Sequence, residues 1–263
     1  MEGHLNLLES LPFWALAWIA AVMLLSGFIH GAIGFGLPII ATPLLALMLD
    51  LKTAVLVVVL PNIAMNVISV VSGGRLRESL GRFWYLPVFL VAGSYVGTRI
   101  LIAVDAAPFI LVLAGMLLVY LNLERLGKTN VPVVKRHPLV AGLGFGFLAG
   151  IFESTVNVSG PVLLMYFMLL GISPTVLVQT LNFCFLGGKL MQVLTWTTSG
   201  GVGLVHWLST VPWALIAATT FFAGQRLRGR VSPETYLGWL RKFLWAMAAL
   251  LVYQYINIMI ERA

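Results

Sequence analysis

The sequence contains little charge and long stretches with none. Only 10% of its 263 residues are Asp, Glu, Lys or Arg, against about 25% in a typical soluble domain, and 60% are hydrophobic. Apolar runs longer than about 18 residues recur along the chain, and such runs are long enough to cross a bilayer as helices. The alternation of apolar and polar residues typical of a membrane β-barrel is missing. The composition therefore excludes a soluble globular domain and predicts an all-α integral membrane protein.

Several functional signatures are also missing. One cysteine, Cys184, and four scattered histidines provide neither an intrachain disulfide nor the spacing of a metal site. No Walker A sequence is present, which argues against direct ATP hydrolysis. "FESTVN" offers Glu153, Ser154 and Thr155 without a nearby histidine, so no enzyme is expected. We expect no cofactor.

The net charge of +7 is spread over short loops, so no nucleic-acid partner is expected. The first apolar run follows "MEGHLNLLES", which carries no Lys or Arg. A secretory signal peptide would begin with a cationic region, so we predict a retained membrane span there.

Ten apolar segments can be marked, and a polar linker divides them into two groups of five. We therefore predict a first membrane repeat over 1–123, a cytoplasmic linker over 124–137 and a second repeat over 138–263. Whether 35–49 and 158–171 cross the membrane fully or are re-entrant stays open. The segments are 11–31, 35–49, 53–72, 83–102, 106–122, 138–152, 158–171, 175–198, 204–224 and 236–259.

Lysine and arginine gather in three connecting segments: "GGRLRESLGR", the linker "NLERLGKTNVPVVKRHP", and "GQRLRGRVSPE". The turns "AVDAAP" and "TTSGGVGLVH" carry neither residue. The positive-inside rule places the basic segments in the cytoplasm and the neutral turns outside. Both termini are then predicted to be periplasmic. Each half contains an odd number of crossings, so the halves run in opposite directions.

The two halves share residues in the same order. These matches predict an inverted 5+5 repeat with broken or re-entrant helices in the first pair of segments of each half, as in many secondary transporters. The pairs are Gly27 with Gly146, Gly31 with Gly150, Pro38 with Pro161, Asn62 with Asn182, Gly93 with Gly224 and Arg99 with Arg230.

Three stretches resemble the TauE/SafE sulfite-exporter family, also called the toluenesulfonate uptake permease family. They are "GFIHGAIGFGLPIIATPLLAL" (the first box, 27–47), "LDLKTAVLVVVLPNIAMN", and "GFLAGIFESTVNVSGPVLLMYFMLLGISPTVLVQTLN", which opens with the second box at 146–161. The resemblance covers almost the whole chain. It implies a bacterial inner-membrane carrier of sulfite, organosulfonates or related organic anions. The family's second box is usually "GxGGG"-like, whereas this chain has "FESTVNVSGP", which puts the usual substrate in doubt.

Each box combines glycine or serine with proline, which disfavours a continuous helix. A half-helix that begins at such a break points free N–H groups into its surroundings, and these groups favour an anion. We predict two half-helix N-termini that meet near the midplane. The residues assigned to this part of the substrate site are Gly34, Gly36, Pro38, Ser159, Gly160 and Pro161.

Polar residues inside apolar spans supply the other candidates, because such residues are costly in a bilayer and usually functional. Glu153 and His30 are assigned to proton coupling, although Glu153 could instead be a helix-end carboxylate in water and His30 a packing residue. Lys189 could balance an anionic substrate or pair with Glu153. Arg99 is either an interface anchor or an outer-vestibule residue. The amides of Asn62, Asn157 and Asn182 could bind anion oxygens or tie helices together.

These features predict a secondary transporter that moves a small anion by alternating access and is driven by an ion gradient. Its expected partners are the anion and the lipid bilayer, and a homodimer is left open. The alternatives are an anion channel, a membrane scaffold subunit or, less favoured, an intramembrane enzyme.

Overall fold

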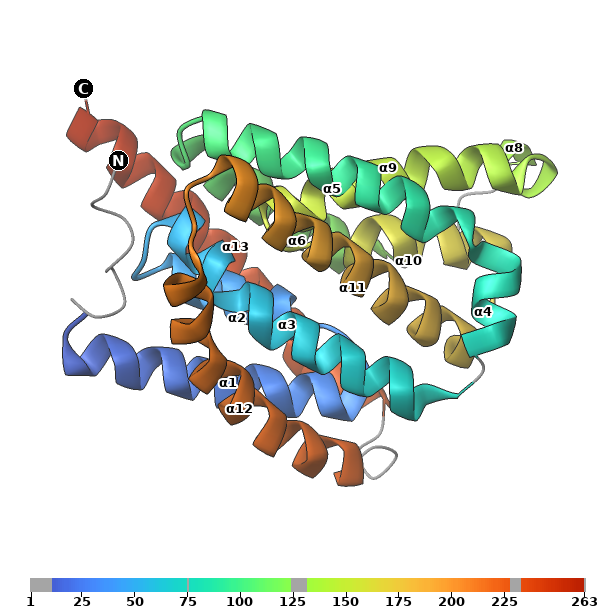
Figure 1. Cartoon of the computed structure of the whole chain (residues 1–263), viewed down its shortest axis with the longest axis horizontal. Coiled ribbons are helices and arrows are strands. Elements are labelled where there is room, and N and C mark those ends of the chain that lie inside the picture. The colour runs from blue at the N-terminus through green and yellow to red at the C-terminus, as the bar shows by residue number, and fades with distance from the viewer. Residues whose placement is uncertain (1–10, 75, 124–131, 228–232, 263) are drawn as a thin grey trace.

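The computed structural model describes residues 11–74, 76–123, 132–227 and 233–262. Every regular element in these ranges is a helix (Figure 1). The helices before the linker are α1 (Phe13–Ile33), α2 (Leu37–Ala46), α3 (Leu51–Gly73), α4 (Leu76–Phe83), α5 (Tyr85–Ala103) and α6 (Ala107–Leu121). Those after it are α8 (Pro132–Arg136), α9 (Pro138–Thr155), α10 (Gly160–Leu170), α11 (Pro174–Ser199), α12 (Leu204–Leu227) and α13 (Pro233–Arg262).

Among the described helices, seven are long and apolar enough to cross a membrane, namely α1, α3, α5, α9, α11, α12 and α13. The shorter apolar helices are α2, α6 and α10. With 10 and 11 residues, α2 and α10 are only about 15 Å long, which is half the hydrocarbon thickness. The protein is therefore a multi-pass membrane protein in which segments 35–49 and 158–171 form half-length helices.

The predicted polar connections are partly helical. Helix α4 lies within "GGRLRESLGR", where a loop was expected, and α8 lies at the end of the linker, most of which is outside the described residues. In α4 the charged residues Glu78 and Arg82 lie near its start and end, where they complement the helix dipole. The prediction of loops was wrong here because both helices are shorter than the window of about 11–18 residues over which a helical period is recognised.

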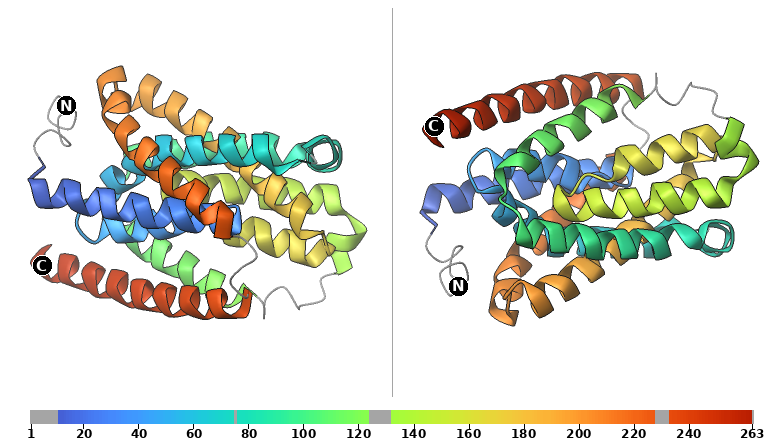
Figure 2. Two further views of the ribbon diagram at one scale, coloured as in Figure 1. Left: turned by 90° about the horizontal axis from the view of Figure 1, so that it is seen from below. Right: turned by 90° about the horizontal axis from the view of Figure 1, so that it is seen from above.

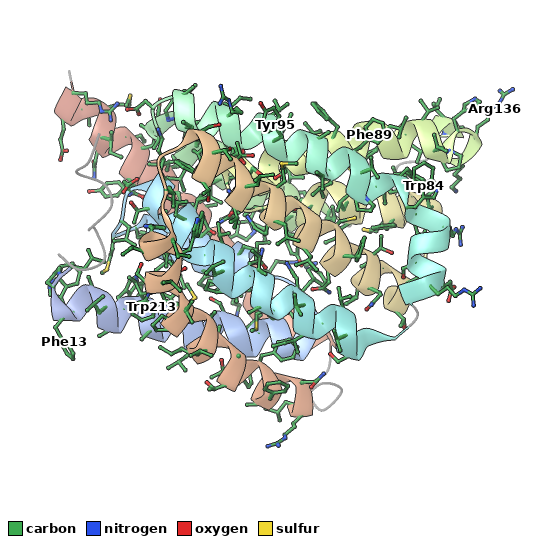
Figure 3. All side chains as sticks on the ribbon, viewed as in Figure 1. Phe13, Trp84, Phe89, Tyr95, Arg136 and Trp213 are labelled. Atoms are coloured by element: carbon green, nitrogen blue, oxygen red, sulfur yellow. The ribbon has the colours of Figure 1, made fainter. Side chains whose placement is uncertain are left out.

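The two ends of the bundle differ in charge. Helix α1 begins and α13 ends at one end, where Arg262 pairs with Asp105 of the α5–α6 turn at 3.3 Å (Figure 1). Helices α4 and α8, with the basic residues Arg77, Arg82, Lys135 and Arg136, lie at the opposite end, where Figure 3 labels Arg136. Arg125, Lys128, Arg228 and Arg230 lie outside the described residues.

Two helix crossings bring backbones into direct contact (Figure 2). In the α1–α12 crossing, a Cβ added at Gly31 would lie 2.0 Å from the Phe221 carbonyl oxygen. In the α5–α9 crossing, a Cβ added at Gly150 would lie 2.1 Å from the Leu90 carbonyl oxygen. Small residues allow such close packing in membranes, where van der Waals contact is a major attractive force between helices. Both crossings therefore require glycine.

The remaining long helices fill the centre and the periphery. Helices α3 and α11 pack against each other; α3 also packs on α12, and α11 also packs on α5. Helices α6 and α13 pair at the periphery, as the right view of Figure 2 shows. Large apolar side chains such as Phe13, Trp245 and Tyr253 remain exposed on the outer surface, as expected for a surface in contact with lipid.

Candidate functional site

The chain breaks its helix inside the first box. Helix α1 ends at Ile33, and the N–H of Gly34 closes it by donating to the His30 carbonyl at 2.7 Å. Gly34 and Gly36 have φ angles of 103° and 107°, which glycine adopts readily and other residues rarely do. Helix α2 then begins at Leu37, with Pro38 in its first turn, where a missing N–H costs nothing. Two glycines and a proline thus make this first break.

A second break follows Glu153, but it is built differently. Helix α9 ends at Thr155, and Asn157 takes a φ of 59° without being glycine. Asparagine is one of the few side chains that tolerate this region. Ser159 precedes helix α10, which begins at Gly160 and has Pro161 in its first turn. The sequence assigned this break to Ser159, Gly160 and Pro161, whereas the left-handed residue is Asn157, two residues before Ser159.

The two breaks border one small cavity. Phe35, Gly36, Pro38 and Ile39 line it from the first break. The second break contributes Glu153, Asn157, Val158, Ser159 and Gly160, and Tyr120 of α6 and Phe185 of α11 complete the wall. Its volume is about 20 Å³, which is room for roughly one water molecule. The residues at the N-terminal ends of α2 and α10 thus face the same point, in a state too closed to hold a sulfonate.

A buried ion pair lies beside the cavity. The Lys189 Nζ of α11 is 3.2 Å from the Glu153 Oε1, and the two side chains are 0% and 1% exposed. The Ser159 hydroxyl donates to the other carboxylate oxygen, Oε2. Asn62 of α3 donates a long hydrogen bond of 3.5 Å to Oε1. The carboxylate therefore lies at the start of α10, surrounded by donors.

Lys189 is fully engaged. Besides the carboxylate, its ammonium group donates to the Glu153 carbonyl at 2.9 Å, to the Gln192 Oε1 at 2.8 Å and to the Asn157 Oδ1. The Asn157 amide nitrogen donates in turn to the Thr42 hydroxyl at 3.1 Å. A buried charge is tolerated when it is paired and hydrogen-bonded in this way. The cluster joins the second break to helices of both halves.

The matched pair Asn62 and Asn182 reaches across the protein in a reciprocal manner. Asn62, on α3, contacts Glu153 near the second break, while Asn182, on α11, donates to the carbonyl of Gly34 in the first break at 2.7 Å. The second amide hydrogen of Asn182 bonds the Val178 carbonyl of its own helix at 2.8 Å. Asn182 is therefore engaged in holding the first break and does not line the cavity.

His30 lies beneath the first break and is completely buried. Its Nδ1 accepts a hydrogen bond from the Leu37 N–H at 3.4 Å, and its Nε2 lies 3.2 Å from the Ser69 hydroxyl. An Nδ1 that accepts carries no proton, so this arrangement favours a neutral ring with its hydrogen on Nε2. His30 satisfies a backbone N–H at the start of α2.

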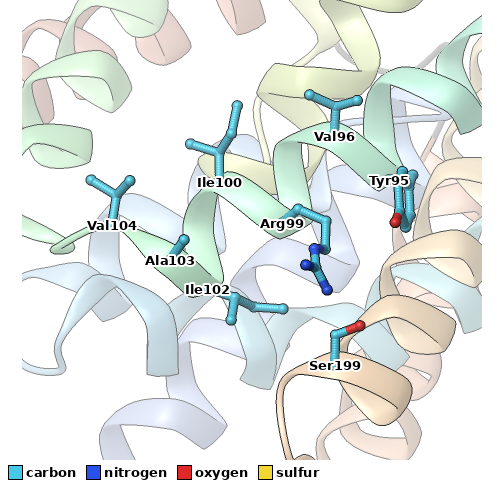
Figure 4. A pocket seen from close by; sticks show the side chains of 8 residues that line it. All are labelled: Tyr95, Val96, Arg99, Ile100, Ile102, Ala103, Val104 and Ser199. Atoms are coloured by element: carbon cyan, nitrogen blue, oxygen red, sulfur yellow. The ribbon is translucent and has the colours of Figure 1, made fainter.

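Arg99 is not part of this cluster but lines a separate open hollow of about 560 Å³ near the end of α5 (Figure 4). Its guanidinium points toward Ser199 of α11, with Tyr95 beside it and apolar walls around it. Arg99 is exposed, and the structure shows it in no hydrogen bond or ion pair with the described residues. It belongs to the end of the bundle that also holds Asp105 and the last turn of α13.

Two residues of the site carried no usable signal in the sequence. Thr42 and Tyr120 sit in apolar segments, and only the packing of α2 and α6 brings them to the Asn157 amide and to the cavity wall.

Within the described ranges, no three His, Cys, Asp or Glu side chains come together as a metal site would require.

Comparison with known proteins gives one match. The family model described as "Sulfite exporter TauE/SafE" matches residues 19–255, nearly the whole chain. No curated protein and no solved structure matches.

Proposed function

Because the chain belongs to the sulfite exporter TauE/SafE family, we propose that it is a secondary carrier that moves a small anion across the bacterial inner membrane by alternating access. The anion is sulfite, an organosulfonate such as sulfoacetate, or a related organic anion. The observation that carries the proposal is the single cavity bordered by the N-terminal ends of both half-helices.

Helix N-termini are suited to anions because their first N–H groups lack partners within the helix and carry partial positive charge. At the midplane of a bilayer these groups would be costly unless they faced protein, water or a ligand. Here α2 and α10 begin at Leu37 and Gly160 beside the cavity. The Leu37 N–H is already taken by His30, and the proline in each first turn carries none, so the anion would use the remaining N–H groups of the two first turns. Lys189 adds a full positive charge next to the cavity. An anion that enters the opened cavity would replace the water lost from its hydration shell with these donors.

The proposal includes an inverted 5+5 repeat that relates α1, α2, α3, α5 and α6 to α9, α10, α11, α12 and α13. In this relation α1 corresponds to α9, α3 to α11 and α5 to α12. The packing supports it, because replacing each helix by its counterpart converts the α1–α12 crossing into the α9–α5 crossing. The same replacement converts the α3–α12 contact into the α11–α5 contact. The reciprocal reach of Asn62 and Asn182 follows the same rule. Carriers with this architecture open alternately by moving one group of helices against another.

The proposed topology places both termini and the Arg99 hollow on the periplasmic side. The basic helices α4 and α8 lie at the opposite end, as expected for cytoplasmic segments. Arg99 would then attract anions to an outer vestibule. A cysteine introduced at Glu78 should react with a membrane-impermeant maleimide only from the cytoplasmic side, and labelling of intact cells would overturn this orientation.

Flux in proteoliposomes tests the proposed function. The full-length protein should give saturable uptake of labelled sulfite or sulfoacetate that a pH gradient accelerates. Linear, non-saturating flux would indicate a channel instead, and absence of any flux in either direction would leave a scaffold role. We propose Glu153 as the proton-coupling site.

A pair of glycine variants ties the flux to the cavity. Gly36→Ala places a methyl group at a left-handed position that lines the cavity, and we expect it to reduce transport strongly. Gly201→Ala is the matched control, because Gly201 has a φ of 73° but lies in the α11–α12 turn with open space around it. Equal losses in both variants would show that backbone strain, and not the cavity, limits transport.

A further inference from the structure

Glu153 occupies the position that an anionic ligand would take. Its carboxylate receives the Ser159 hydroxyl, the Asn62 amide and the Lys189 ammonium group beside the start of α10. All of these partners are donors, and a sulfonate or carboxylate ligand would seek the same set. The chain thus fills its own anion site.

Lys189 cannot serve a second anion while this arrangement holds. Its ammonium group has three hydrogens and is already surrounded by oxygens of Glu153, Asn157 and Gln192. A ligand anion beside an ionised Glu153 would also leave one negative charge without a counter-ion in a buried site, which is strongly unfavourable. The carboxylate must therefore lose its charge before a ligand can use the lysine.

We propose that the site works by exchange: a proton neutralises Glu153, and a singly charged oxyanion replaces its carboxylate at Lys189. This inference rests on the proposed function and names the class of substrate. The charge balances at each step. The closed site holds Glu153 and Lys189 as a neutral pair, and the loaded site holds a neutral carboxylic acid, the ammonium group and one anionic charge.

The limit of one negative charge follows from the count of buried cations. Among the buried side chains of the described residues, Lys189 is the one lysine or arginine. Simple alkanesulfonates, monocarboxylates and hydrogensulfite carry a single charge, whereas sulfate, fully ionised sulfite and sulfoacetate, which has both a sulfonate and a carboxylate, carry two. A dianion would leave one charge uncompensated even with Glu153 protonated. Monoanions are therefore the ligands that this site accepts. The exchange thus selects hydrogensulfite and simple organosulfonates among the proposed substrates and excludes sulfoacetate.

The other titratable groups around Glu153 do not supply a second charge. Cys184 of α11 lies close enough to feel the carboxylate's charge, and Tyr120 of α6 shares the cavity wall. Both are neutral in their usual state. Asn62 of α3 and Ser159 at the start of α10 do not titrate.

His30 lies at the first break, where Ser69 and Leu37 engage its ring nitrogens. Within the cluster at Lys189, the group that can take up the proton is therefore Glu153.

Calorimetric binding of methanesulfonate and sulfate to the purified full-length protein tests the exchange. Methanesulfonate keeps its single charge from mildly acidic to mildly alkaline pH, so any pH dependence belongs to the protein. If binding takes up one proton, the affinity for methanesulfonate must rise as the pH falls. At pH values above the pKa of Glu153, the rise should be about tenfold per pH unit. Sulfate should bind more weakly than methanesulfonate at every pH. Equal binding of the two anions would overturn the charge limit.

Glu153→Gln should bind methanesulfonate at all pH values as tightly as the wild type does in acid, because glutamine resembles the protonated acid. Glu78→Gln is the matched control, since Glu78 is an exposed carboxylate on α4, and it should keep the wild-type pH dependence. A Glu153→Gln protein that keeps this dependence would overturn the exchange.

A measurement on the wild type does not depend on the folding of a variant. The heat of binding, compared in buffers of different ionisation enthalpy, should show uptake of one proton per methanesulfonate bound. Binding or transport without proton uptake would overturn the exchange and leave the carrier function standing. If neither methanesulfonate nor sulfite is bound or transported, the proposed function itself fails.

Discussion

The two helix breaks solve the same backbone problem in different ways. The first break uses Gly34 and Gly36, whose backbones need no side chain to reverse the direction of the chain. It is supported by neutral groups, namely His30, Ser69 and the Asn182 amide. The second break has no glycine at its reversal and uses Asn157 in a left-handed conformation.

The difference determines where charge lies. Because Asn157 has a side chain, it can bond Lys189 on one side and Thr42 on the other, which a glycine could not do. The side chains at the second break therefore hold an ion pair in place, whereas the first break holds none among its described contacts. The first break only redirects the backbone, whereas the second break redirects the backbone and also positions the Glu153–Lys189 ion pair.

The largest effect is expected from Lys189→Met, which leaves Glu153 buried without its cation. Removing one partner of a buried ion pair costs about 3–5 kcal/mol in the free energy of unfolding. The double variant Lys189→Met with Glu153→Leu should recover much of this loss, because no charge then stays buried, yet it should remain inactive in transport. Denaturant unfolding in detergent measures both. A double variant no more stable than the single one would contradict the isolated-charge explanation.

A smaller and equal loss is expected at the two glycine crossings. Gly31→Ala and Gly150→Ala each place a methyl group against a carbonyl oxygen of the neighbouring helix. Overpacking of this kind costs about 1–3 kcal/mol in the free energy of unfolding. Gly115→Ala on α6, where the added group meets open space, is the control and should cost nothing. Unequal losses would show that the two crossings are not equivalent.

His30→Gln should reduce stability by about 1 kcal/mol, because the buried Leu37 N–H loses its acceptor. The sequence also assigned His30 to proton coupling, and the variant separates the two roles. If His30 positions α2, the pH dependence of flux in proteoliposomes stays that of the wild type. A flux that no longer responds to a pH gradient would support the proton-coupling assignment.

The smallest effect is expected at the exposed ion pair, which contrasts with the buried one. The N–H of Ala107 first, and Arg262 second, lower the pKa of Asp105 below its ordinary value. The folded state is therefore stabilised by ionised Asp105 at pH values above the ordinary pKa of an aspartate. This stabilisation is lost as the pH falls through the lowered pKa of Asp105. Asp105→Asn should lower the melting temperature slightly at neutral pH and not at all in strong acid. A difference that persists in acid would assign the effect to packing.

Much of the helical architecture could be predicted because membrane spans produce long apolar runs. The ten marked segments correspond to the ten apolar helices, and glycine and proline in each box marked the two breaks. The exact reversal of the second break was missed because asparagine signals a left-handed position less strongly than glycine. Helices α4 and α8 were missed because they are shorter than the window of about 11–18 residues over which a helical period is recognised.

The site could be predicted only in part. Glu153, Asn157 and Lys189 were marked because polar residues in apolar spans are costly, and the structure joins them in one cluster. Thr42 and Tyr120 carry no such cost, since a hydroxyl can bond within its own helix or reach an interface. Their roles depend on which helix faces they occupy, and this is set by the packing of the whole bundle.

The glycine crossings have a mechanical consequence. Helices α1 and α12 touch backbone to backbone, as do α5 and α9, so each pair resists sliding and separation. Each pair takes one helix from either side of the linker. Each tightly packed pair therefore joins the two halves, and we expect a displacement that begins in one half of the chain to be transmitted to the other.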